Sequence, residues 1–222
     1  CHGFNTSKEW YQLLPLMICR QDIAVLTFDF SGNGCSEGKF ESMTLTKEIR
    51  DLGEAIDCMH EKKQNGQQRL AIIGFSMGGL AGAVQSSMDS RINLYVGVSP
   101  LVDPKKTFRR ILKDKGFEDW KIKGFANVQS INPFTQKKLN FSFMDDFRRY
   151  DINDAAKKLA IPCLIIHGDH DRIVETEEVR KLAASIRDCN LEIIKNASHY
   201  WENPIHRIIS YRMIVDFLKK NF

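Results

Sequence analysis

The chain has 222 residues, of which 43% are hydrophobic and 27% charged, a composition typical of a globular protein that buries a substantial core. Its net charge of +4 comes from basic residues spread along the chain, which does not favour a nucleic-acid partner. No apolar run approaches the ~18 residues of a membrane span, so no transmembrane segment is predicted.

Six cysteines are scattered along the chain without a Cys-x-x-Cys pair. We interpret them as free thiols in a reducing compartment and expect a cytoplasmic protein. The chain opens on Cys1-His2-Gly3-Phe4 with no methionine, as if at the end of a strand, so we allow for residues upstream of Cys1.

Short, near-continuous apolar runs alternate with amphipathic stretches. Such runs are typical of strands buried on both faces of a parallel sheet, with helices between them in the sequence. The predicted strands are Ile23 to Phe28, Leu70 to Ile73, Asn93 to Val98, Pro162 to Ile166 and Leu191 to Ile194. The sequence therefore predicts an α/β fold in which a mostly parallel sheet has helices on both faces.

Two of the predicted helices have clear start signals. One follows Thr44, a suitable N-cap, and repeats apolar residues at helical spacing from Leu45 to Met59. The other begins at Asn203 and Pro204, which fit the N-cap and first helical position, and has an apolar face that extends to Phe217. We assign these apolar positions to the core.

The alternation is interrupted between residues 101 and 155. This segment holds seven of the fourteen phenylalanines and has no strong strand pattern before Ile161. So long an interruption in a compact α/β chain indicates an insert with its own structure. We therefore predict an α/β core formed by residues 1–100 and 156–222, with a cap formed by residues 101–155.

The pattern G-x-S-x-G occurs twice, around Ser36 and around Ser76. In a nucleophile elbow, a buried strand turns sharply into a helix, and the neighbours of the serine must be small. Ser76 follows an apolar run and precedes small residues that open a helix predicted to continue through Met88. Ser36 lies in a glycine-rich loop that starts no such helix, so Ser76 is the candidate nucleophile and Ser36 a turn residue.

A serine hydroxyl needs a base to take its proton and a third group to orient that base. Among six histidines, His199 lies in the loop after the last predicted strand, where ligands bind in such sheets. We expect the acid in the loop after the preceding strand. Asp169 and Asp171 compete for that role there, and either is also suited to capping the turn.

Four motifs give the chain a resemblance to the α/β-hydrolase superfamily, in its serine esterase, lipase and peptidase branch. They are H-G-x at residues 2–4, D-x-x-G-x-G-x-S at 29–36, G-x-S-x-G-G at 74–79 and H-G-x-x-D-x-x-V at 167–174. The resemblance covers nearly the whole chain, and the order Ser76, Asp, His199 also matches. The resemblance makes Ser36 part of a structural loop. It makes Asp171 the acid, because Asp171 occupies the Asp position of H-G-x-x-D-x-x-V and lies further along the loop than Asp169, with room to turn toward His199. One departure is that the hairpin that usually precedes H-G-x is absent from these residues.

The resemblance implies acyl transfer to water by Ser76, with no metal and no cofactor. The backbone N–H groups of Phe4 and Met77 would form the oxyanion hole. A serine at the elbow, where other branches have an aspartate, argues against an epoxide hydrolase or a dehalogenase.

The substrate is less well defined. Short H-G-F esterases with an insert of this length, including bacterial feruloyl (hydroxycinnamoyl) esterases, are similar overall. Aromatic side chains of the insert would wall an apolar pocket for the acyl group, and the candidates are Phe108, Trp120, Phe125, Phe141 and Phe143.

We therefore predict a hydrolase for small to medium, partly aromatic carboxylic esters. The alternatives are a monoacylglycerol lipase or lysophospholipase, a thioesterase or small-peptide hydrolase and, from a different class, a binding scaffold without catalysis. A small-molecule ester is the expected partner, and the oligomeric state is open.

Overall fold

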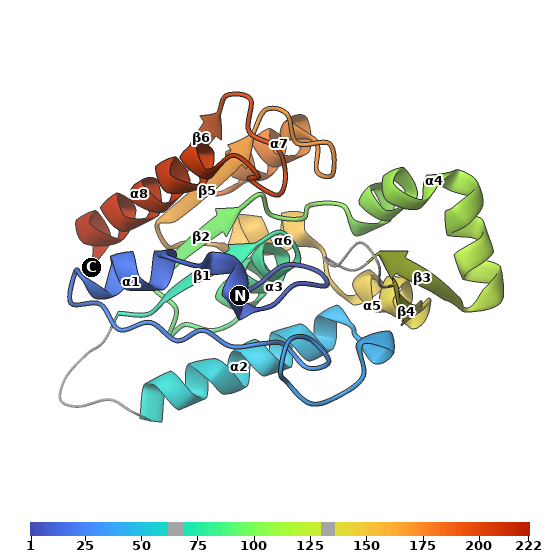
Figure 1. Ribbon diagram of the computed structural model, residues 1–222. Coiled ribbons are helices and arrows are strands. Elements are labelled where there is room, and N and C mark those ends of the chain that lie inside the picture. Colours follow the sequence, from blue (N-terminus) through green and yellow to red (C-terminus); the bar gives the residue numbers. More distant parts are fainter. Residues whose placement is uncertain (62–68, 130–135) are drawn as a thin grey trace.

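The computed structural model describes residues 1–61, 69–129 and 136–222 (Figure 1). Its main sheet has four parallel strands in the order β1, β2, β5, β6, with bounds Ala71–Phe75, Leu94–Val98, Cys163–Gly168 and Cys189–Ile194. The predicted α/β class with a mostly parallel sheet is confirmed, and four of the five predicted strands lie within a few residues of these bounds.

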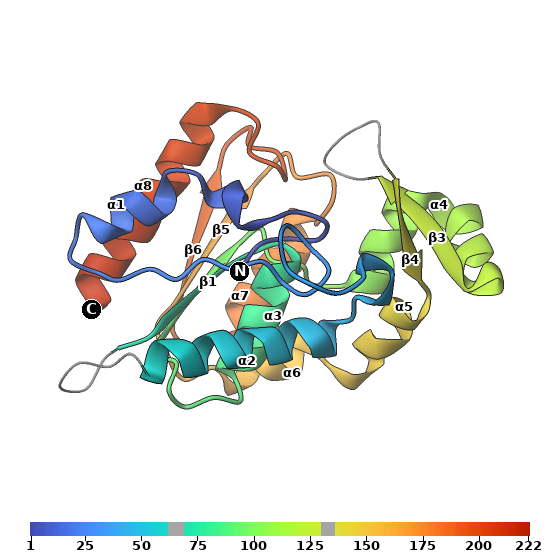
Figure 2. The ribbon, with the colours of Figure 1, turned by 60° about the horizontal axis from the view of Figure 1, so that its bottom comes forward.

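Helices cover both faces of this sheet, as Figures 1 and 2 show. On β2, Leu94, Val96 and Val98 pack into one apolar cluster, while Tyr95 packs into another on the opposite face. The first cluster is closed by α1 (Leu14–Cys19) and α8 (Pro204–Asn221). The second is closed by α2 (Leu45–Glu61), α3 (Met77–Ser86), α6 (Ile152–Lys158) and α7 (Thr176–Ser185). The continuous apolar runs of the sequence follow from this two-sided burial.

Both predicted helix starts are confirmed. Thr44 Oγ1 accepts a hydrogen bond from the Lys47 N–H at 3.2 Å at the beginning of α2. Asn203 Oδ1 accepts from the Ile205 N–H at 2.9 Å, and Pro204 occupies the first position of α8. Each cap satisfies an N–H group that has no partner within its own helix.

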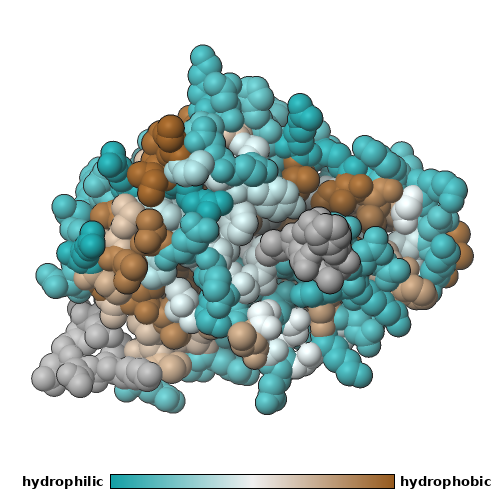
Figure 3. All heavy atoms as spheres, in the orientation of Figure 1, coloured by the Kyte–Doolittle hydropathy of each residue, from teal (hydrophilic) through white to brown (hydrophobic). Residues whose placement is uncertain are grey.

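The predicted strand from Ile23 to Phe28 is wrong. An open apolar groove, lined by this segment on one side and by residues 70–73 on the other, separates it from β1. Among the described residues the segment pairs with no strand, and Ala24, Leu26 and Thr27 are exposed. Apolar surface gathers on the left of Figure 3, where this segment and α1 lie in Figure 1.

Residues 101–155 contain α4 (Pro104–Lys123), an antiparallel pair of strands, β3 (Phe125–Gln129) and β4 (Gln136–Asn140), then α5 (Ser142–Asp146). These elements lie together on the right of Figure 1, away from α1 and α8. The two strands correct the expectation of no strand here. Both are short, β3 mixes apolar and polar residues, and β4 is mostly polar. Each has one buried residue, Val128 and Leu139, so neither has the continuous apolar run of a central strand.

The buried aromatic residues of this insert belong to the same apolar cluster as α2 and α3. The division into core and cap stays a prediction, and α6 crosses its boundary at residue 155. Three short 3-10 turns complete the described elements, η1 (Lys8–Tyr11), η2 (Phe40–Ser42) and η3 (Phe147–Arg149).

All six cysteines are unpaired, as the sequence predicts. Among the described helices, none has the length and apolar character needed to cross a lipid bilayer.

Candidate active site

Ser76 occupies a sharp turn between β1 and α3. Its φ of 52° lies in the left-handed region that residues other than glycine rarely adopt, and its backbone is held by a hydrogen bond from its N–H to the Val98 carbonyl at 2.9 Å. A Cβ on Gly74 would lie 2.2 Å from the Gly78 carbonyl oxygen, and one on Gly78 would lie 2.4 Å from the His2 carbonyl oxygen. The small residues of G-x-S-x-G are thus required by the close approach of strand, helix and N-terminal loop.

His199 lies in the loop after β6 and contacts both other predicted members of the site. Its Nε2 is 3.0 Å from Ser76 Oγ, and its Nδ1 is 2.7 Å from Asp171 Oδ2. Because a carboxylate only accepts, Nδ1 carries the proton and Nε2 is free to accept from the serine hydroxyl. The rings of Phe75 and Tyr200, with centroids 5.2 and 5.1 Å away, pack against the imidazole. The structure thus brings together all three residues predicted as catalytic.

Asp171 is buried in the loop between β5 and α7. Its Oδ1 accepts hydrogen bonds from the N–H groups of Ile173 at 2.8 Å and Val174 at 2.9 Å. Burial opposes its charge, but the hydrogen bond from His199 and the backbone donor Val174 hold the pKa of this carboxyl below its ordinary value. Asp171 is therefore ionised at neutral pH, with one oxygen committed to its own loop and the other to His199.

Asp169, the competing acid, points away from His199. Its Oδ1 accepts from the Asn196 N–H at 2.5 Å and lies 2.7 Å from His170 Nδ1. It therefore joins the loop after β5 to the loop after β6, a structural contact between the two segments that carry Asp171 and His199.

Phe4 and Met77 are the residues predicted to supply oxyanion-hole N–H groups. Met77 directly follows Ser76, and Phe4 belongs to the N-terminal loop that packs against the start of α3. Met77 is the first residue of α3, so its N–H has no acceptor within the helix. Phe4 follows Gly3 in the N-terminal loop. This loop crosses the start of α3 so closely that a Cβ on Gly78 would collide with the His2 carbonyl oxygen. The Phe4 N–H donates to no backbone group among the described residues. Both N–H groups are thus available to a ligand.

His2 fixes this loop, a role that sequence reasoning missed. Its Nε2 accepts from the Phe30 N–H at 2.9 Å, and its Nδ1 lies 2.9 Å from the Gly3 carbonyl oxygen. Burial lowers the pKa of His2 to about 4, so the ring is neutral and bridges two loops. Its place at the head of H-G-x, two residues before the predicted oxyanion-hole residue Phe4, was the signal available in the sequence.

His167 is a second buried histidine that the sequence analysis named only as part of a motif. Its Nδ1 is 3.7 Å from Asp171 Oδ2, and burial lowers its pKa to about 4. It therefore adds an uncharged polar ring beside the buried carboxylate.

The aromatic residues of the insert pack mainly on one another. The Phe108 ring lies 5.2 Å from Phe4 and 5.2 Å from Phe143, and Phe141 packs edge-to-face on Trp120 at 5.3 Å. Phe108, Trp120 and Phe143 are buried and connect the insert to the loop of Phe4. Phe125 differs, because it lies on the exposed face of β3 with Lys138 Nζ over its ring at 4.9 Å.

The side chain of Ser36 bonds to a neighbouring loop residue and belongs to a different part of the fold from Ser76, His199 and Asp171. Its Oγ donates to the Asp29 carbonyl at 2.6 Å, and Asp29 Oδ1 accepts from the Lys8 N–H at 2.7 Å. No helix starts at Ser36, so it closes a loop, as the sequence indicated. Among the described residues, no three His, Cys, Asp or Glu side chains are grouped as metal ligands.

The parallel sheet, the strained serine between β1 and α3, the acid in the loop after β5 and the histidine in the loop after β6 define an α/β hydrolase. The chain belongs to the family described as "Serine aminopeptidase, S33" (Hydrolase_4), whose model matches residues 1–139 and 132–203. The predicted superfamily and its esterase and lipase branch are thereby confirmed.

Among curated proteins, the chain is 30% identical to monoacylglycerol lipase abhd6-B of Xenopus laevis, over 98% of this chain and 73% of that protein. Among solved structures, it is similar to Est1E from Butyrivibrio proteoclasticus with ferulic acid bound, with TM-score 0.86, 23% identity and coverage of 99% and 86%. It is also similar to the monoacylglycerol lipase of Paleococcus ferrophilus, with TM-score 0.75, 18% identity and coverage of 100% and 93%. The two structural likenesses bear on the fold.

Proposed function

We propose that Ser76, His199 and Asp171 form a catalytic triad that hydrolyses carboxylic esters through an acyl-enzyme. Ser76 Oγ attacks the ester carbonyl while His199 Nε2 takes the hydroxyl proton. The imidazolium that forms is stabilised by Asp171 Oδ2 and then gives its proton to the departing alcohol. A water molecule, deprotonated by the same nitrogen, attacks the acyl-serine and releases the acid. No metal or cofactor takes part in this scheme.

The negative charge of each tetrahedral intermediate would be bound by the N–H groups of Phe4 and Met77. The Met77 donor also lies at the N-terminus of α3, where the helix dipole favours negative charge. One oxyanion-hole donor is typically worth ~3 kcal/mol of transition-state stabilisation.

The observation that supports this proposal best is the pair of hydrogen bonds at His199, 3.0 Å to Ser76 Oγ and 2.7 Å to Asp171 Oδ2. The test is labelling with a fluorophosphonate probe, followed by digestion and mass spectrometry. A triad takes up the probe at Ser76, and prior incubation with an ester substrate slows the labelling. A binding scaffold without catalysis takes up none, and that result would remove the proposal.

The substrate we favour is a small to medium ester with a partly aromatic acyl group, such as a hydroxycinnamoyl ester. The support is the buried aromatic cluster of Phe108, Trp120 and Phe143, which the Phe4 ring joins directly. The structure of Est1E with ferulic acid bound is similar to this chain over 99% of this chain's length. Phe125, on the exposed face of β3, has the weakest support among the five proposed pocket residues.

The second candidate is a monoacylglycerol lipase, which the names of the curated relatives favour. A substrate panel separates the two candidates. It contains methyl hydroxycinnamates, monoacylglycerols of rising chain length and, because the family is described as an aminopeptidase family, an aminoacyl nitroanilide. The first candidate predicts the highest kcat/KM on methyl hydroxycinnamates. A kcat/KM that rises steadily with acyl length would favour the lipase.

A further inference from the structure

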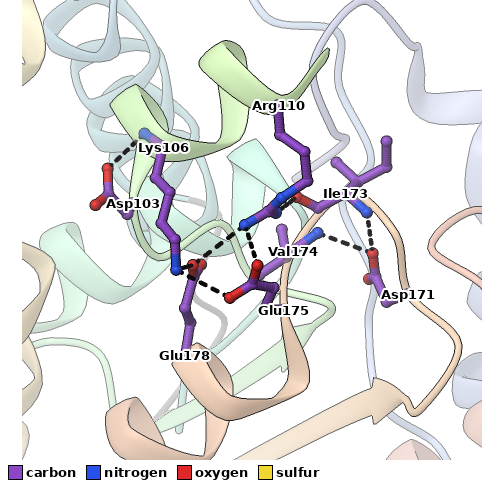
Figure 4. A network of polar contacts seen from close by, with 8 residues as sticks. All are labelled: Asp103, Lys106, Arg110, Asp171, Ile173, Val174, Glu175 and Glu178. Atoms are coloured by element: carbon purple, nitrogen blue, oxygen red, sulfur yellow. Dashed lines mark hydrogen bonds and ion pairs between the residues drawn. The ribbon is translucent and has the colours of Figure 1, made fainter. Parts of the chain in front are cut away.

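A polar network joins α4 of the insert to the loop that carries Asp171 (Figure 4). Arg110, on α4, donates from Nη1 to the Ile173 carbonyl at 2.5 Å and lies 2.8 Å from Glu175 Oε1 through Nη2. Its side chain is 24% exposed, so most of this side chain is shielded from water. The loop of the candidate acid is thus held from the insert by a directional donor.

The carbonyl of Ile173 and the N–H of Val174 belong to one peptide group. That N–H donates to Asp171 Oδ1 at 2.9 Å. A single rigid peptide therefore lies between the Arg110 guanidinium and the Asp171 carboxylate. A cation at the carbonyl end polarises the peptide, strengthens its N–H as a donor and fixes the plane in which that N–H points.

The chain of contacts continues to the serine. Oδ2 of the same carboxylate accepts from His199 Nδ1 at 2.7 Å, and His199 Nε2 lies 3.0 Å from Ser76 Oγ. An unbroken series of hydrogen bonds thus extends from the insert to the candidate nucleophile.

We propose that Arg110 is a positioning residue, which orients the Asp171 carboxylate toward His199 through the peptide between Ile173 and Val174. This inference rests on the proposed function. It assigns to the insert a part in arranging the acid as well as in shaping the pocket.

Lys106 provides an internal comparison, because it lies one turn earlier on α4 and binds Glu175 and Glu178, which Arg110 Nη2 also contacts at 2.8 and 3.4 Å. Its Nζ is 2.9 Å from Glu175 Oε2 and 2.5 Å from Glu178 Oε1. Among the described residues, it makes no hydrogen bond with the backbone of the loop, as Figure 4 also shows. Lys106 therefore ties α4 to α7 by charge, whereas Arg110 also holds a specific peptide, which the planar fork of a guanidinium favours.

The test compares Arg110→Ala with the matched control Lys106→Ala over the ester panel, with active enzyme counted by fluorophosphonate titration. We expect Arg110→Ala to lower kcat and kcat/KM equally for every ester, by about fivefold, the effect of one hydrogen bond on the transition state. KM should stay within about twofold, since an effect on kcat and kcat/KM alike indicates an interaction made in the transition state. Lys106→Ala should keep the kcat of the original protein.

The distinguishing measurement repeats Arg110→Ala in an Asp171→Ala background. If Arg110 acts through the carboxylate, its removal has no further effect there, and the two losses are not additive. An equal fivefold loss in both backgrounds, an equal loss in Lys106→Ala, or a change confined to KM or acyl preference would overturn the proposal. Arg110→Lys keeps the positive charge but lacks the forked donor, and it is measured in the same way. It serves as the test variant if Arg110→Ala does not fold. If Ser76→Ala stays active, it is the proposed function that fails.

Discussion

Replacing Asp171 by asparagine tests the assignment of the acid, because the two oxygens of Asp171 have different partners. Oδ1 accepts from the N–H groups of Ile173 and Val174, and Oδ2 accepts from His199 Nδ1. An asparagine must place its one carbonyl oxygen toward the two backbone donors. The reversed orientation would leave both donors facing an NH₂ group, at a cost of roughly 1–3 kcal/mol each.

The amide NH₂ then faces His199 Nδ1 and can only donate to it. The imidazole responds by carrying its proton on Nε2, where it faces Ser76 Oγ as a second donor. With no base for the hydroxyl, we expect kcat to fall by about 10³ to 10⁴, or ~4 to 5.5 kcal/mol in the barrier, the size of the same substitution in serine proteases.

The assay is hydrolysis of an activated ester under saturating conditions, with the melting temperature measured in parallel. The asparagine retains the backbone hydrogen bonds, so the fold should persist. Asp169→Asn is the control, since its carboxylate contacts Asn196 and His170 and should change kcat by no more than a few-fold. A folded Asp171→Asn with kcat within tenfold of the original, beside an inactive Asp169→Asn, would refute the assignment and move the acid.

Three further outcomes are expected. Ser76→Ala should abolish ester hydrolysis while Ser36→Ala, which loses one loop hydrogen bond, keeps most of it; activity measured on folded variants decides, and the reverse pattern would move the nucleophile. Gly78→Ala should lower kcat by at least tenfold, because its Cβ would lie 2.4 Å from the His2 carbonyl and displace the loop of the oxyanion hole; unchanged kinetics would contradict this close approach. Burial lowers the pKa of His2 and His167 from 6.5 to about 4. Between these two pH values the unfolded chain therefore binds more protons than the folded chain. The free energy of unfolding should fall on acidification, by about 2 kcal/mol per histidine between pH 7 and 5, and urea denaturation should show a shallower fall in His167→Gln.

The sequence was sufficient for the parts of the fold that a two-sided core requires. The strands β1 and β2 are apolar throughout, and the helices after Thr44 and Asn203 begin at side chains that cap them. The serine was identified because only small residues tolerate the approach of β1, α3 and the N-terminal loop. In each case a local physical requirement restricts the residue types of a few consecutive positions, so a sequence pattern can identify it.

The parts that failed depend on partners distant in sequence. The run from Ile23 to Phe28 is as apolar as a strand. Whether such a run pairs depends on its neighbours in the fold, and here a groove lies between it and β1. β3 and β4 lack a continuous apolar run, because they are short and pair with one another outside the main sheet. His2 and Arg110 act through backbone groups in other loops, and a backbone acceptor has no residue type that a sequence pattern could identify.

The groove beside β1 has a consequence for strand pairing. β1 is an apolar strand with β2 on one side. On the other side, Cys1 donates to the Ile73 carbonyl and accepts from the Phe75 N–H, and the Tyr11 hydroxyl also donates to the Ile73 carbonyl. The remainder of that edge has no strand partner among the described residues, and a strand edge without a partner is a template on which another strand can add. A further strand that adds beside β1 would lie in this groove, whose lining does not include Ser76.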